Sequence, residues 1–191
     1  MSSDIRDFKI RDFRATDFEA LWRIDQTCFP PGISYSRTEL RIYMRRRASF
    51  TLVAVRTAAG ARSVPDSGNT KKRSLIGPEE VALAAASSPA IGDIAGFIVA
   101  EAGNRDSGHI ITIDVVAAAR RSGVGSLLLR AAEDRLRAAE CRAVALETAV
   151  DNGSALSFYK RHGYSVVKTF PRYYANGVDA LVLNKELDAP A

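Results

Sequence analysis

Short runs of apolar and β-branched residues recur along the chain, each bounded by glycine, proline or charged residues, and such runs are typical of β-strands. They lie at residues 8–13, 50–56, 94–102, 109–116, 143–150, 164–170 and 180–187. We expect the runs at 50–56 and 94–102 to pair as an antiparallel hairpin.

Other stretches carry apolar residues at helical spacing. Thr16 and Glu19, and again Ser36 and Glu39, form the Thr/Ser-x-x-Glu pattern that caps a helix. These caps predict one helix that ends near Pro30 and a second that continues to about residue 47. Two further helices are predicted at 123–139 and 153–161. Because helices interleave with some strands while other strands follow one another directly, the pattern predicts a mixed α/β sheet.

Residues 57–93 separate the two hairpin strands and are rich in Ala, Ser, Gly and basic residues. Loops longer than about 12–15 residues are uncommon in compact domains, so we interpret this segment as an insertion that is partly mobile. Residues 75–86 within it are compatible with a short helix. The basic stretch at 62–73 is compatible with an acidic partner, although a solvated loop is the interpretation that charge runs favour.

Composition narrows the class of protein. A chain of 191 residues with 47% hydrophobic and 26% charged residues predicts a single globular domain, here 1–191, and not a membrane or disordered protein. The polar N-terminus lacks the apolar core of a signal peptide, which favours the cytoplasm. Cys28 and Cys141 have no metal-ligand or redox spacing, so we expect no metal site. The net charge of +5 suits an anionic ligand but does not indicate nucleic-acid binding.

The segment Arg120-Arg121-Ser122-Gly123-Val124-Gly125 joins a predicted buried strand to a predicted helix. Free amides at a helix N-terminus and the helix dipole stabilise a phosphate, glycines let the backbone approach it, and arginines add charge-assisted contacts. A plain glycine-containing turn with solvated arginines is the simpler alternative. A dinucleotide-binding unit is disfavoured because Leu128 occupies the position of its third glycine.

Four blocks in order, ITIDVV, RRSGVGSLLL, ALETAVDNGSALSFYKRHGY and RYYANGVDALVL, make the chain similar to the GNAT N-acetyltransferases. Their acetyl-CoA signature, Gln/Arg-x-x-Gly-x-Gly/Ala, is matched by Arg120, Gly123 and Gly125. The chain most resembles the branch that contains the ribosomal-protein-alanine N-acetyltransferases and their N-terminal acetyltransferase relatives. The resemblance implies the GNAT fold, with a central sheet of six to seven strands flanked by about four helices.

The resemblance also implies acetyl-CoA as the donor and direct acetyl transfer to an amine in a ternary complex. Glu147 aligns with the family's general base and Tyr159 with its general acid. From the residues alone, Glu147 is better explained as a surface strand carboxylate paired to an arginine. For Tyr159 the simple alternative is a core aromatic, although the neighbouring Phe158 is the better candidate for the core. The residues that the resemblance implies for the cofactor are Ile113, Val115, Val116, Arg120, Arg121, Ser122, Gly123, Val124, Gly125, Ser126, Asn152 and Tyr159.

In the N-terminal acetyltransferases, the loop after the first helix and the final hairpin close over the acceptor peptide. Here that implies an acceptor site formed by Phe29, Tyr35, Glu147, Tyr173 and Tyr174, although tyrosines in loops are equally often packing residues. The expected acceptor is a protein N-terminus, with a ribosomal protein as one example, and the expected state is a monomer or weak dimer. A small-molecule amine acetyltransferase and a CoA-binding module without catalysis remain as alternatives.

Overall fold

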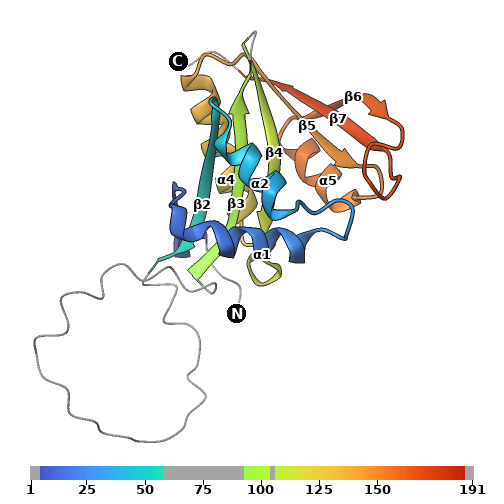
Figure 1. Cartoon of the computed structure of the whole chain (residues 1–191). Coiled ribbons are helices and arrows are strands. Elements are labelled where there is room, and N and C mark those ends of the chain that lie inside the picture. The colour runs from blue at the N-terminus through green and yellow to red at the C-terminus, as the bar shows by residue number, and fades with distance from the viewer. Residues whose placement is uncertain (1–4, 58–92, 104–105, 188–191) are drawn as a thin grey trace, which may run out of the picture.

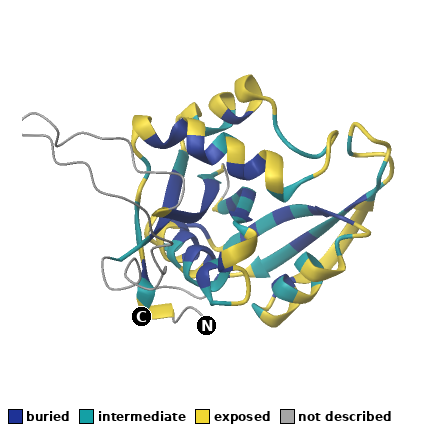
Figure 2. Ribbon diagram, turned by 90° about the horizontal axis from the view of Figure 1, so that it is seen from below, coloured by how far each residue is buried: buried dark blue, intermediate teal, exposed yellow. Residues whose placement is uncertain are grey.

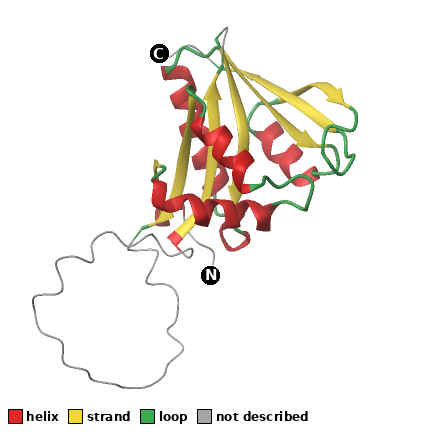
Figure 3. Ribbon diagram, viewed as in Figure 1, coloured by secondary structure: helices red, strands yellow, loops and turns green. Residues whose placement is uncertain are grey.

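The computed structural model describes residues 5–57, 93–103 and 106–187, which form one mixed sheet with helices on both faces (Figures 1 and 3). The strands are β1 (Phe8–Asp12), β2 (Ser49–Arg56), β3 (Ile94–Ala102), β4 (Ser107–Val115), β5 (Ala143–Ala149), β6 (Ser165–Phe170) and β7 (Ala180–Glu186). The α-helices are α1 (Phe18–Cys28), α2 (Arg37–Arg45), α4 (Val124–Ala138) and α5 (Gly153–Arg161), and the short 3-10 helices are η1 (Ile5–Asp7), η2 (Ala15–Asp17) and η4 (Ala117–Ala119).

The strand order is β1-β2-β3-β4-β5-β7-β6. Only the central pair β4 and β5 runs parallel, and α4 provides the crossover between them; the other neighbours are antiparallel. The predicted mixed sheet, with seven strands and four α-helices among the described residues, is therefore confirmed.

The sheet separates two hydrophobic cores, and β3 contributes to both. Ile98 and Ala100 belong to the core beneath α4 and α5, whereas Phe97 and Val99 belong to the core beneath α1 and α2. A strand covered on both faces has a continuous apolar sequence, which explains the run in β3. Figure 2 shows buried residues along the strands, with helices on either side of the sheet.

The two predicted helix caps have different outcomes. Ser36 Oγ accepts from the Glu39 amide and Glu39 Oε2 accepts from the Ser36 amide, so the cap of α2 is confirmed. The predicted Thr16 cap of α1 is wrong, because Thr16 lies inside the 3-10 helix η2 and α1 begins at Phe18, with Asp17 at its N-cap. The buried Asp17 carboxylate instead accepts from the Arg14 amide at 2.8 Å, which closes that 3-10 turn.

The hairpin of β2 and β3 is confirmed, and the other predicted strands and the helices α4 and α5 agree with the structure to within two residues at each end. The predictions for 62–73 and 75–86 lie outside the described residues. Within the described ranges, no helix is both long enough and apolar enough to cross a membrane.

Candidate active site

Two neighbouring parallel strands separate partway along their length. The pairing of β4 with β5 ends at Ile110 and Leu146, although β4 continues to Val115 and β5 to Ala149. Figure 1 shows the two strands diverging from this point. A cleft of about 1070 Å³ lies at the divergence and is lined by both strands, by the first residues of α4 and by α5.

At one end of the cleft, the loop before α4 passes twice through the left-handed backbone region. Arg121 has φ 63° and Gly123 has φ 89°. Such a conformation costs a non-glycine residue about 1–3 kcal/mol and is found most often at functional sites. A Cβ on Gly123 would lie 2.9 Å from Cδ1 of Ile5, which would have to move, and the positive φ would strain any larger residue there. The loop presents backbone amides at a helix N-terminus, which is an arrangement that binds anions.

The residues predicted to hold the cofactor fall into two groups. Ile113, Val115, Arg120, Arg121, Gly123, Gly125, Ser126, Asn152 and Tyr159 line the cleft. The other three do not line it. Val124 is fully buried in the core, Val116 packs against both cores, and Ser122 Oγ donates to the Ala119 carbonyl. Only the main-chain groups of Val124 are therefore available to a ligand.

The N-termini of α4 and α5 both line the cleft. Asn152 caps α5, because its Oδ1 accepts from the Ala155 amide at 3.1 Å. At the start of α4, a Cβ on Gly125 would lie 3.4 Å from the Phe158 ring, which is an ordinary van der Waals contact with α5.

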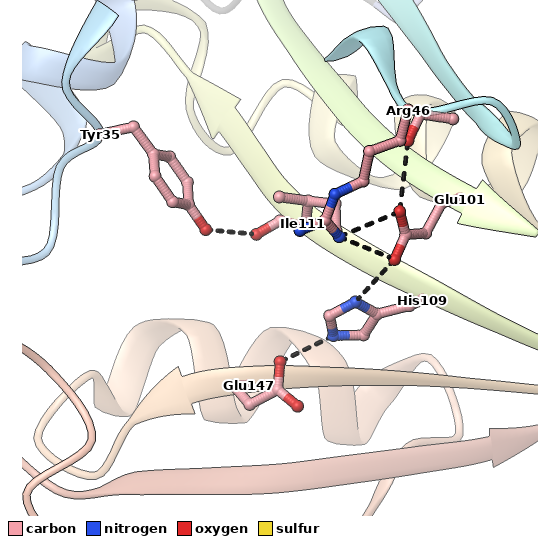
Figure 4. Close-up of polar contacts among 7 residues, drawn as sticks. Tyr35, Arg46, Glu101, His109, Ile111 and Glu147 are labelled. Carbon is pink, nitrogen blue, oxygen red and sulfur yellow. Dashed lines mark hydrogen bonds and ion pairs between the residues drawn. The ribbon is translucent and has the colours of Figure 1, made fainter. Parts of the chain in front are cut away.

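Glu147 lies on β5 beside the cleft and is held by a histidine on β4. Its Oε2 is 2.7 Å from Nε2 of His109, and Nδ1 of His109 is 4.0 Å from Oε1 of Glu101 (Figure 4). Arg46 donates to both oxygens of Glu101. Glu147 is therefore paired, but with an imidazole in the site and not with a surface arginine.

Tyr159 reaches the cleft from α5 and is also part of the core, with 6% of its surface exposed. Burial, and then the nearby Asp114 and Tyr174, raise the pKa of its phenol, which keeps the phenol protonated at neutral pH. The two interpretations from the sequence, core aromatic and proton donor, are thus compatible at this position.

Three of the predicted acceptor residues, Phe29, Tyr35 and Tyr174, also line the cleft, together with Glu147. Tyr173 is not among the cleft-lining residues; it is 50% exposed and packs against Tyr174. The tyrosines therefore differ in their surroundings, and Tyr173 lies at the edge of this group.

A β-bulge fixes Tyr35. The register between β3 and β4 shifts after Val99, which leaves Ile111 without a partner in the pairing, and the Ile111 carbonyl accepts from the Tyr35 hydroxyl at 3.3 Å (Figure 4). The Tyr35 amide donates to Asp25 Oδ2 at 2.9 Å. The loop after α1 is therefore tied to both β4 and α1 at this residue.

The sequence interpretation missed a buried acidic pair beneath β4. Asp114 on β4 and Asp25 on α1 each have a buried oxygen without a hydrogen-bond partner among the described residues. Burial raises the pKa of Asp114 to about 8 and that of Asp25 to about 6, and in each case hydrogen bonds to the carboxyl oppose part of the rise. The signal was visible, because Asp114 is the one charged residue in the apolar run ITIDVV.

The cysteines and acidic residues give no evidence of other chemistry within the described ranges. Burial raises the pKa of both free thiols, Cys28 and Cys141, so neither is an activated nucleophile. No group of three potential ligands is placed to hold a metal ion in that part of the chain.

The cleft fits a long, phosphorylated cofactor. Its α4 end offers backbone amides, two arginines and no side chain at Gly123 or Gly125, as a pyrophosphate requires. Its walls, between the separated strands, offer unpaired β4 backbone beside apolar side chains, as an extended amide-containing arm requires. The fold and the cleft together define a group-transfer protein of the CoA-dependent class.

Comparison with known proteins gives the same class. Residues 18–164 match the Acetyltransferase (GNAT) family, and the chain belongs to that family, whose enzymes use acetyl-CoA as the acetyl donor.

Individual relatives are similar over parts of their length. N-alpha-acetyltransferase 30 of Schizosaccharomyces pombe is 38% identical over 38% of this chain and 49% of its own length. The chain spans about half the length of the curated relatives it matches first.

Solved structures agree in fold. Ard1 from Thermoplasma volcanium superposes with a TM-score of 0.71 at 24% identity, over 95% of this chain and 99% of that one. The ribosomal-protein-S18-alanine N-acetyltransferase from Escherichia coli gives 0.66 at 18% identity, over 96% of each chain. At these identities the likeness shows the fold alone.

We predict that Gly123→Ala both destabilises the protein and weakens CoA binding. The new methyl group meets Ile5 in a backbone conformation that alanine disfavours, at a cost of about 1–2 kcal/mol, and it distorts the anion-binding loop. Gly153→Ala is the matched control, since nothing lies within 4 Å of its added Cβ. Urea unfolding and calorimetric CoA titration measure both effects; equal CoA affinity in the two variants would contradict the assignment of this loop.

We predict that Asp114 lowers stability at alkaline pH. The pKa of its carboxyl is about 8 in the folded protein against 3.8 for an unperturbed aspartate. The protonated carboxyl therefore contributes fully to the free energy of unfolding below pH 3.8, and this contribution is lost as the pH rises toward 8. The free energy of unfolding should fall on the order of 2 kcal/mol between pH 6 and pH 8.5, and Asp114→Asn should remove this fall.

Asp12→Asn is the control for that experiment, because ion pairing with Arg135 lowers the pKa of the Asp12 carboxyl and keeps its titration below this range. Urea unfolding at the two pH values is the measurement. A fall that persists unchanged in Asp114→Asn would show that another group causes it.

Proposed function

We propose that the protein transfers an acetyl group from acetyl-CoA to the α-amine of a protein N-terminus. The observation that carries the proposal is one continuous cleft that joins the α4 N-terminus to Glu147 and reaches Tyr35 and Tyr174. The donor and the acceptor amine can therefore meet within a single site. The names of the matched relatives, which include N-alpha-acetyltransferases, support the same acceptor class.

Two loops approach each other over the acceptor end. A Cβ on Gly32, in the loop after α1, would lie 3.1 Å from Cβ of Asn176, in the turn between β6 and β7. The loop after α1 contributes aromatic and apolar side chains to the cleft, namely Phe29, Pro30 and Ile33. A narrow, apolar entrance favours the end of an extended peptide over a polycationic small molecule, which would require several carboxylates.

The cofactor supplies an activated acetyl thioester. On this proposal Glu147 accepts the proton of the incoming ammonium group, directly or through water, while His109 holds its Oε2 in place. The protonated phenol of Tyr159 donates to the departing thiolate. Backbone amides of the unpaired part of β4 polarise the acetyl carbonyl. Since the amine attacks directly, no covalent enzyme intermediate is required.

The acceptor protein follows less directly from the site. A structural neighbour acts on ribosomal protein S18, according to its name, and we propose a ribosomal-protein N-terminus as the first acceptor to test.

We predict that acetylation requires a free α-amine. Peptides with an unblocked N-terminus should become acetylated at residue 1, and the same peptides with a formylated N-terminus and an internal lysine should not; mass spectrometry of the products assigns the site. Acetylation confined to lysine side chains, or to polyamines and aminoglycosides, would contradict the proposed acceptor and favour the small-molecule alternative.

We predict that Glu147→Gln lowers kcat by about 10²–10⁴-fold and Tyr159→Phe by about 10²-fold or more, with CoA affinity retained, because each removes a proton-transfer group. Glu186→Gln is the control, since this exposed carboxylate lies at the far end of β7. Steady-state assays of CoA release measure kcat. Tight CoA binding without turnover on any amine, in wild type as in the variants, would instead identify a CoA-binding module without catalysis.

A further inference from the structure

His162, at the end of α5, is bonded to a residue of the phosphate-binding end of the cleft. Its Nε2 is 2.9 Å from Oγ of Ser126, which lines the cleft in the first turn of α4. Its Nδ1 is 2.8 Å from the carbonyl oxygen of Phe158. Both ring nitrogens therefore have fixed partners.

These partners determine where the protons lie. A carbonyl oxygen only accepts, so Nδ1 carries a hydrogen and donates to Phe158. In the neutral imidazole Nε2 is then a bare acceptor, and the Ser126 hydroxyl must donate its single hydrogen to it. Under these conditions Ser126 presents only lone pairs to the cleft, where they oppose an anionic phosphate oxygen.

Protonation of the ring reverses the bond to Ser126. Nε2 of the imidazolium donates to Ser126 Oγ, and the hydroxyl hydrogen becomes free to turn into the cleft. We propose that His162 is a positioning residue that makes Ser126 a donor to the pyrophosphate of CoA, so that cofactor binding is coupled to the uptake of one proton by His162. The inference rests on the assignment of the α4 N-terminus as the cofactor site and not on the identity of the acceptor.

Several charged groups lie on the elements that surround His162. They are Asp151 before α5, Lys160 and Arg161 on α5, Arg121 before α4, and Arg130 and Glu133 on α4. Asp25 and Asp114, whose raised pKa values fall in the same pH range, belong to the α1 side of β4. Variants of Ser126 and His162 separate any effect of these two carboxyl groups on CoA binding from the effect of the His162 imidazole.

The test is calorimetric titration with dephospho-CoA between pH 5.5 and pH 8.5. This ligand retains the pyrophosphate but lacks the 3′-phosphate monoester, whose own second pKa near 6 would obscure the result. Wild-type affinity should be about tenfold higher at the acidic end, the effect of one charge-assisted contact, with uptake of up to one proton per ligand. Titrations in two buffers of different ionisation enthalpy count that proton.

Ser126→Ala and His162→Asn should both bind dephospho-CoA with an affinity that no longer changes between about pH 5.5 and pH 8.5. His109→Gln changes the only other histidine of the chain and should keep the wild-type dependence. A pH dependence that survives in Ser126→Ala but not in His162→Asn would mean that the ring charge acts directly and would overturn the role of Ser126.

A measurement on the wild-type protein alone avoids any folding defect of the variants. Proton NMR should show the pKa of the His162 imidazole rising by about one unit when dephospho-CoA is bound. A rise of one unit corresponds to the tenfold difference in affinity expected between acidic and alkaline pH. An unchanged pKa in the bound protein would overturn the inference while leaving the cofactor site intact. Failure of dephospho-CoA to bind at any pH would overturn the cofactor site itself, and the inference with it.

Discussion

The early end of the pairing between β4 and β5 is the constraint on which the site depends. Parallel strands normally continue their ladder, but here it stops at Ile110 and Leu146 while both strands extend further. The divergence gives β4 an open backbone edge and places Glu147 of β5 opposite it. It also makes room for α5, whose Tyr159 reaches the same cleft. Each of these elements is positioned by the sheet, and none requires an irregular loop to do so.

The cost of this arrangement is visible beneath β4. The strand continues past its partner with a bulge at Ile111, and the structure secures it there through Tyr35 from the loop after α1. Asp25 holds the Tyr35 amide, and Asp114 lies in the same buried region with a raised pKa. Unsatisfied buried carboxylate oxygens are expensive, and functional regions are where such compromises between stability and geometry are expected.

The sequence predicted most of the fold because the fold rests on local patterns, and the cofactor residues that it proposes come from patterns of the same kind. Apolar runs define the strands, Ser36 and Glu39 define a cap, and Gly123 with Gly125 defines the loop before α4. The failures are non-local. Thr16 was replaced as a cap by a turn that Asp17 closes, and the Glu147–His109 contact joins residues 38 positions apart across two strands. Spacing along the chain cannot reveal which side chains a parallel pairing brings together.

The two histidines of the chain each contact a residue that lines the cleft and is proposed to act there. His109 contacts Glu147 at the acceptor end, and His162 contacts Ser126 at the phosphate end. Because the contacts involve different groups on different elements, a proton at one end need not affect the other. Cofactor affinity and turnover can then respond to pH through separate residues, and a single pH–rate profile would combine the two. Binding of the donor without the acceptor present isolates the phosphate end, which is why its proton is best counted there.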